Sequence, residues 1–155
     1  LSQLLEKYEI IHIYGQKNYE KHKEKIDPAL PKGYHLYPFL GEDQLKYAYI
    51  LADLIISRAG ASSIFEIAAA RKPSILIPLP TAAADHQREN AFEYAKSGAT
   101  VILEQANLTP HLFLVEINRI LDNKELSQKM GERAKSFSTP DAGQKIAEEL
   151  LEWGS

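Results

Sequence analysis

Short apolar segments alternate with amphipathic helical segments along almost the whole chain. Strands that are apolar on both faces and are separated by helices form parallel sheets with helices covering both sides. The alternation therefore predicts an α/β fold with a doubly wound, Rossmann-like parallel sheet. The expected strands cover residues 9–14, 34–38, 53–57, 74–79 and 100–103.

Residues that are typical of helix caps predict where several helices begin or end. Asp85 is an expected N-cap, and Gly98 stands where a helix C-terminus favours glycine. Thr109 before Pro110 is typical of a helix start, because proline fits the first helical position. The segment 17–26 is a charged helix or loop. The expected helices cover residues 1–7, 42–51, 62–71, 86–97, 110–121, 124–136 and 141–153.

The amino-acid composition excludes several classes of protein. A chain of 155 residues that is 45% hydrophobic fits one domain with one sizeable core. Its 18 basic and 21 acidic residues are intermixed, which leaves no basic face for nucleic acid. Absence of cysteine excludes disulfides and thiol catalysis, and no segment has the ~18 to 20 apolar residues of a membrane span. We expect an intracellular domain without a signal peptide, cut from a longer protein because residue 1 is not methionine.

The segment SRAGASSIFE, residues 57–66, joins an expected strand to an expected helix through five consecutive small residues. Unpaired N–H groups and the positive end of the dipole let a helix N-terminus hold a phosphate. Glu66 could accept hydrogen bonds from both hydroxyls of a ribose. The alternative is a capping box, in which Ser63 and Glu66 satisfy only the backbone of their own helix.

Carboxyl ends of parallel strands gather the ligand-binding turns of such folds, which makes the turns 12–17, 57–63 and 78–87 candidates. Gln87 and Asn90 share a helix face and could contact sugar hydroxyls. His86 is an additional candidate, although a lone loop histidine is more often solvated. The alternative for this turn is that Asp85 caps the helix and the other polar residues are solvated.

Three further residues complete the candidate site. Arg58 could reach a phosphate, or could be an ordinary surface arginine. In the turn after the second strand, apolar contact and backbone hydrogen bonds could hold a uracil. Leu40 is the better candidate for the edge of the base. Phe39 is an additional candidate, with a place in the core as the favoured alternative. Histidines show no metal-ligand spacing, so we expect no metal and no other cofactor.

A family resemblance covers nearly the whole chain. The motifs that carry it are RAGASSIFEIAAARKP, IPLP, DHQREN-A, the Gly98-Ala99 pair, and Glu104-Gln105 before a Leu-Thr helix start. Together they resemble the C-terminal domain of the MurG family, in glycosyltransferase family 28. The resemblance implies one half of a GT-B enzyme that binds UDP-N-acetylglucosamine. It implies inverting transfer of the sugar onto lipid I, which forms lipid II for peptidoglycan, and hence roles in cell shape and division.

The resemblance also assigns roles within the site. Glu66 would hold the ribose hydroxyls, Leu40 the uracil through its backbone, and Gln87 the N-acetylglucosamine hydroxyls. The family's arginine corresponds to Arg58. The donor phosphates would lie against the residues Gly60, Ala61, Ser62 and Ser63.

Two parts of the family's machinery are missing from this sequence. The GGSxGA turn that touches the diphosphate is absent, and so is the N-terminal domain that binds the lipid-linked acceptor. We therefore expect no catalytic residue within residues 1–155, and a full-length protein on the inner face of the cell membrane. Two other functions stay open. They are a UDP-N-acetylglucosamine epimerase, which typically has paired glutamates where Glu66 is single, and the donor-binding subunit of a two-part transferase.

Overall fold

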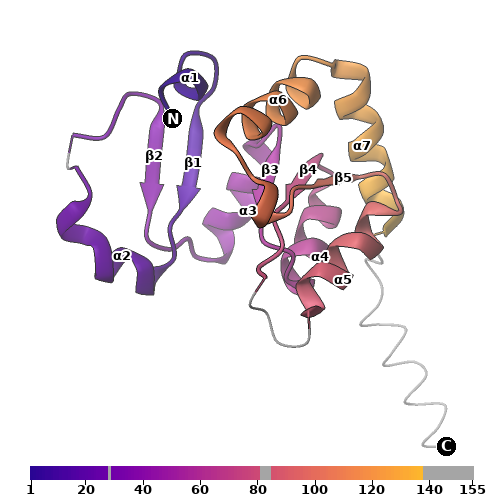
Figure 1. The fold of residues 1–155 in the computed structure, drawn as a ribbon, viewed down its shortest axis with the longest axis horizontal. Coiled ribbons are helices and arrows are strands. Elements are labelled where there is room, and N and C mark those ends of the chain that lie inside the picture. Colours follow the sequence, from indigo (N-terminus) through magenta and orange to yellow (C-terminus); the bar gives the residue numbers. More distant parts are fainter. Residues whose placement is uncertain (28, 81–84, 138–155) are drawn as a thin grey trace, which may run out of the picture. The chain divides into compact units, whose positions relative to one another are not determined.

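A computed structural model describes residues 1–27, 29–80 and 85–137 (Figure 1). The expected helix 141–153 and part of the turn 78–87 lie outside the described residues. The chain divides into two compact units, Leu1–Leu51 and Ala52–Ser155. The expectation of one domain stays a prediction.

The first unit contains one parallel strand pair. Strands β1 (Ile10–Ile13) and β2 (Tyr34–Tyr37) lie side by side, with Ile10 opposite Tyr34 (Figure 1). The charged segment after β1 is helical. The helices of this unit are α1 (Ser2–Leu5), α2 (Gln16–His22), the 3-10 helix η1 (Lys23–Lys25) and α3 (Glu42–Leu51).

The second unit contains a three-stranded parallel sheet in the order β3-β4-β5. Its strands are β3 (Ile55–Ser57), β4 (Ser74–Leu76) and β5 (Thr100–Ile102). The strands alternate with helices, which confirms the predicted α/β fold with parallel pairing. The helices are α4 (Ala61–Ala70), α5 (His86–Ala95), the 3-10 helix η3 (Gln105–Asn107), α6 (Pro110–Leu121) and α7 (Lys124–Phe137).

The core of the second unit is built on its central strand. Every residue of β4 is buried, and α4 packs against α5 and α7 (Figure 1). Ile75 and Leu76 are completely buried, as are Ile67 of α4 and Ile120 of α6. All three strands point the same way, so their carboxyl ends lie at one edge of this sheet. The turns that follow β3, β4 and β5 therefore come together there.

Two of the expected caps are confirmed, and the third, Asp85, is confirmed in position but makes no side-chain cap bond. The Thr109 hydroxyl accepts a hydrogen bond from Leu112 N at 3.1 Å, and Gly98 has a φ of 75°. Asp85 precedes α5, but its side chain makes no capping bond. An N-cap side chain reaches the helix N–H groups from an extended backbone. Asp85 is instead left-handed, with a φ of 56°, and its carboxylate lies 3.8 Å from Arg88.

None of the helices within these ranges combines the length and the apolar character that crossing a bilayer requires.

A close approach between α4 and α7 depends on glycine. A Cβ atom on Gly131 would lie 2.7 Å from the carbonyl oxygen of Arg71. We expect Gly131→Ala to lower the free energy of unfolding by ~1 to 3 kcal/mol, the usual cost of overpacking. This is opposite to helix propensity, which favours alanine by about 1 kcal/mol. Urea unfolding measures the difference.

Gly60→Ala is the matched control. Gly60 has a φ of −67°, and within the described part of the chain its added Cβ would meet only the Ser63 hydroxyl, at 3.8 Å. Its unfolding free energy should fall by only about 0.5 kcal/mol, the modest preference for glycine over alanine at an N-cap. Equal stability of Gly131→Ala and wild type would show that the contact with Arg71 imposes no constraint.

Tyr94 should make stability sensitive to alkaline pH. Burial raises the pKa of Tyr94 to about 12, although the nearby Ser74 hydroxyl opposes the rise. An unfolded tyrosine ionises near pH ~10. The contribution of Tyr94 to the free energy of unfolding is therefore complete below pH ~10. It decreases as the pH rises toward 12, by roughly 1 kcal/mol at pH 11.

Replacement by phenylalanine tests this effect. Tyr94→Phe should remove this part of the alkaline decline, as measured by urea unfolding between pH 8 and pH ~11. Near neutral pH it should cost little, because neither the Tyr94 nor the Ser74 hydroxyl makes a well-formed hydrogen bond within the described ranges. Tyr47→Phe, at an exposed side chain, should keep the wild-type decline. An unchanged slope in Tyr94→Phe would contradict the assignment.

Candidate functional site

The turn between β3 and α4 presents an uncapped helix N-terminus. Gly60 is the N-cap residue, with a ψ of 143°, and its carbonyl accepts the first helical hydrogen bond from Ile64 N at 3.0 Å. Glycine has no side chain that could cap the helix, and no side-chain cap bond is formed at Gly60. The N–H groups of residues 61–63 have no acceptor among the described residues. Such groups and the helix dipole together favour an anion.

The capping-box alternative for this turn is wrong. It requires Ser63 to be the N-cap residue, whereas Ser63 is the third residue of α4. Because the helix begins three residues earlier than a capping box would place it, Glu66 lies in the second turn of the helix and is exposed. Among the described residues, only Ser63 comes within 4 Å of a Cβ added at Gly60, so these residues leave the space above Gly60 open. A ligand can therefore reach the backbone here.

Arg58 is tied to the two neighbouring turns. Its Nη1 atom donates to the side-chain oxygen of Gln105 at 2.8 Å and to the carbonyl of Ile77 at 3.1 Å. A longer contact, 3.5 Å, joins the same nitrogen to the carbonyl of Pro78. Its Nε and Nη2 atoms have no partner within the part of the chain that the structure describes. Arg58 is thus more than an isolated surface arginine.

Two side-chain amides of α5 each form one hydrogen bond to a backbone group with one of their two polar atoms. The side-chain oxygen of Gln87 accepts from Leu79 N at 3.0 Å, and the Asn90 amide donates to the Ala59 carbonyl at 3.3 Å. These bonds assign the amide orientations. Within the described residues, Gln87 is left with its NH2 group, a donor, and Asn90 with its oxygen, an acceptor. Together they can match a hydroxyl group, which both accepts and donates.

His86 has the exposed position expected of a solvated loop histidine. Its Nδ1 lies 3.9 Å from a carboxylate oxygen of Glu89, and both side chains are mainly exposed. It remains at the start of α5, beside Gln87. No group of three or more side chains suited to a metal ion occurs in the described parts of the chain.

A hollow of about 370 Å³ opens beside these turns. Arg88 spans it with an ion pair to Glu104 at 2.9 Å and stacks its guanidinium on the Phe92 ring at 5.6 Å. Sequence reasoning used Glu104 and Gln105 only as marks of resemblance and assigned them no role. Their position directly after β5, at the common edge, was the available signal. The lining residues are Pro78, Leu79, Pro80, Asp85, Arg88, Glu104, Gln105 and Ala106.

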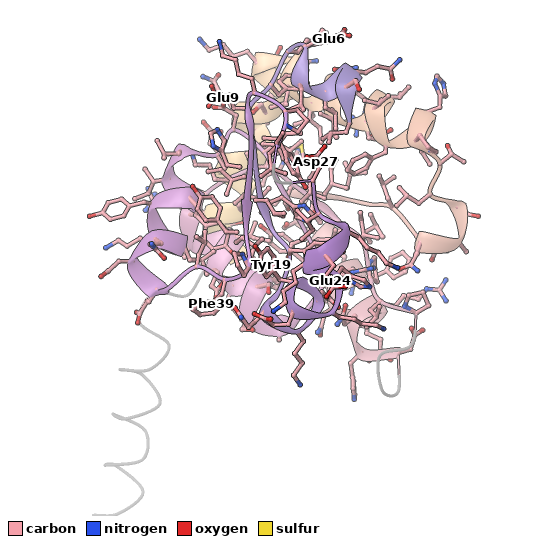
Figure 2. All side chains as sticks on the ribbon, turned by 90° about the vertical axis from the view of Figure 1, so that its left-hand side faces the viewer. Glu6, Glu9, Tyr19, Glu24, Asp27 and Phe39 are labelled. Carbon is pink, nitrogen blue, oxygen red and sulfur yellow. The ribbon has the colours of Figure 1, made fainter. Side chains whose placement is uncertain are left out.

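In the first unit the expected burial of Phe39 is wrong. Its side chain is 68% exposed (Figure 2), whereas Leu40 is buried with 7% exposure. Periodicity cannot decide which of two adjacent apolar residues in a turn faces inward. Neither the N–H nor the carbonyl of Leu40 has a hydrogen-bond partner among the described residues. This arrangement suits a contact made through the backbone of Leu40.

Comparison with known proteins decides the family. The model of the glycosyltransferase family 28 C-terminal domain matches residues 1–146. The chain belongs to this family. The resemblance read from the turn 57–66 and the motifs after it is thereby confirmed.

Relatives of this family 28 domain carry the name "UDP-N-acetylglucosamine--N-acetylmuramyl-(pentapeptide) pyrophosphoryl-undecaprenol N-acetylglucosamine transferase". The protein of Geobacillus kaustophilus is 40% identical over 137 residues, which cover 86% of this chain and 36% of that protein. The protein of Halothermothrix orenii is 36% identical over 139 residues, covering 86% of this chain and 37% of the relative. The chain thus spans less than two fifths of the length of these two relatives.

Solved structures agree with the family assignment. The crystal structure of Acinetobacter baumannii MurG matches with a TM-score of 0.75 and 32% identity, over 93% of this chain and 41% of that one. The spinosyn forosaminyltransferase SpnP matches with a TM-score of 0.68 and 15% identity, over 98% and 37%. At that identity SpnP supports the fold alone.

Proposed function

We propose that this chain binds UDP-N-acetylglucosamine, as the donor half of a hexosyltransferase that glycosylates lipid I and forms lipid II. The observation that carries the proposal is the uncapped N-terminus of α4, with open space above Gly60 and with Glu66 in the next turn of the helix. Family 28 membership and the names of the relatives supply the substrate.

Each part of the donor has a proposed partner of suitable chemistry. The N–H groups of Ala61, Ser62 and Ser63 hold the diphosphate, and the Glu66 carboxylate accepts hydrogen bonds from the ribose hydroxyls. Gln87 and Asn90 offer a donor and an acceptor to the hydroxyls of the sugar. For the uracil, the proposal is the backbone of Leu40, supported by the family resemblance and by its unpaired peptide groups.

The proposed reaction is an inverting displacement. A hydroxyl of the acceptor sugar attacks the anomeric carbon of N-acetylglucosamine while the bond from that carbon to the diphosphate oxygen breaks. Negative charge grows on the departing UDP, where the positive end of α4 stabilises it. In this proposal that helix end replaces a metal ion, and no cofactor takes part.

The acceptor side of the reaction belongs to the longer protein. The chain covers 36% to 37% of the two relatives compared, and no described residue is assigned the proton of the attacking hydroxyl. We propose that the binding site of the lipid-linked acceptor and the catalytic base lie in a region that corresponds to the rest of these relatives. A lipid-linked acceptor and a water-soluble donor would meet at the inner face of the cell membrane.

Glu66→Ala tests the ribose contact. Loss of hydrogen bonds to a charged group should weaken binding of UDP by ~1.5 to 3 kcal/mol, measured by titration calorimetry on the 155-residue chain. Glu132→Ala removes an exposed carboxylate from the middle of α7 and serves as the control, with unchanged affinity. Equal affinity of Glu66→Ala and wild type, with the fold intact, would exclude Glu66 from the site.

The 155-residue chain should bind UDP but transfer no sugar. The physical reason is that the acceptor hydroxyl must be held and deprotonated by groups that the proposal places elsewhere. Incubation with UDP-N-acetylglucosamine and lipid I, followed by chromatography of the lipid products, measures transfer. Formation of lipid II by this chain alone would show that residues 1–155 contain the complete catalytic site.

A further inference from the structure

We propose that Arg58 and Gln105 form a brace that joins the three turns at the carboxyl edge of the second unit's sheet. Arg58 would then be a positioning residue for the donor site, and Gln105 would act through it. The consequence for donor binding rests on the proposed function, whereas the brace itself concerns the ligand-free chain.

The geometry of one nitrogen atom carries this inference. Arg58 follows β3, its acceptors Ile77 and Pro78 follow β4, and Gln105 follows β5. Nη1 bonds to Gln105 at 2.8 Å and to Ile77 at 3.1 Å, and contacts Pro78 O at 3.5 Å. A single guanidinium therefore connects the ends of all three strands. Pro78 has no N–H group, so it cannot extend the sheet hydrogen bonds toward the segment after β5.

The brace satisfies backbone carbonyl groups where the chain leaves the sheet. The bonds from Arg58 to Ile77 and Gln105 are exposed, and the contact with Pro78 is part-buried. Hydrogen bonds from a charged donor are stronger than neutral ones, so a cation that donates to these carbonyls stabilises the turn. Arginine suits this task because its planar group presents several N–H bonds in fixed directions. Nε and Nη2 remain available to a ligand oxygen.

The brace also reaches the proposed sugar contact. Leu79 follows Pro78 directly, and its N–H donates to the side-chain oxygen of Gln87 at 3.0 Å. The segment 77–79 is thus held by Arg58 at its carbonyls and by Gln87 at its N–H group. If the Arg58 bonds were lost, Leu79 could move, and the Gln87 amide would lose its fixed orientation.

The two possible roles of Arg58, direct contact with phosphate and bracing of the turns, predict different behaviour of the ligand-free protein. An arginine that only contacts phosphate leaves the free protein unchanged when it is replaced. Loss of a brace loosens the turns before any ligand is added. Hydrogen exchange of backbone amides in the ligand-free chain measures this difference, because local opening controls the exchange rate.

We would compare the wild-type chain with Arg58→Met, Gln105→Met and Gln105→Glu by NMR-detected exchange. Both methionine variants should raise the exchange rate of Leu79 N–H by about tenfold, the effect expected for lost charge-assisted hydrogen bonds. Gln105→Glu keeps an acceptor and should retain the wild-type rate. The double methionine variant should exchange no faster than Arg58→Met, because both changes break the same bond.

Amides of α6 provide the control for global unfolding, since their exchange should stay at the wild-type rate. Gln105 is exposed, so Gln105→Met should fold even if Arg58→Met does not. Wild-type exchange at Leu79 in both methionine variants would overturn the brace. A loss of UDP affinity in Arg58→Met alone, with that unchanged exchange, would identify Arg58 as a direct phosphate ligand.

Calorimetry with UDP separates the two proposals. We expect Gln105→Met to weaken binding about threefold and Gln105→Glu to restore it, a rescue that follows from the retained acceptor. If the wild-type chain does not bind UDP, the proposed donor function fails. The exchange rate of Leu79 would still decide whether the brace exists.

Discussion

The hydrogen bonds that β4 makes along both of its edges organise the second unit. β4 pairs in parallel with β3 and β5, and the pairing continues past the strand ends, from Ile77 N to Ser57 O at 2.8 Å and from Leu103 N to Leu76 O at 2.9 Å. Complete burial of β4 leaves these bonds no competition from water. As a result three strands end side by side, and every candidate contact of this unit lies in or just after the turns that follow.

In the proposed site, polar side chains at this edge have two functions at once. Gln87 and Asn90 each use one atom to hold a backbone group and, among the described residues, keep another atom that the proposal gives to the ligand. Arg58 divides its nitrogen atoms in the same way. A side chain that is held by a backbone bond loses less conformational entropy when a ligand binds. The site is therefore preorganised by the same contacts that stabilise its turns.

Family membership and site geometry support different parts of the conclusion. The likeness to SpnP at 15% identity shows that this fold tolerates a very different sequence, so the fold alone names no substrate. The uncapped helix with its open turn favours an anion, and the names of the family 28 relatives are what lead the proposal to a nucleotide sugar. The donor proposal needs both, because an anion site by itself would fit many phosphorylated ligands.

Local patterns were enough to predict the alternating strands and helices, the Thr109 cap, and the small-residue turn with its helix N-terminus. These features depend on residues close together in the sequence, which is why the sequence by itself determined them. Tertiary structure decided that α4 begins after Gly60, that Asp85 is left-handed, and that Leu40 rather than Phe39 is buried. It also decided the partner of Arg58, which lies 47 residues away in the chain. Such contacts arise only when the parallel strands bring distant turns to one edge, and periodicity cannot reveal them.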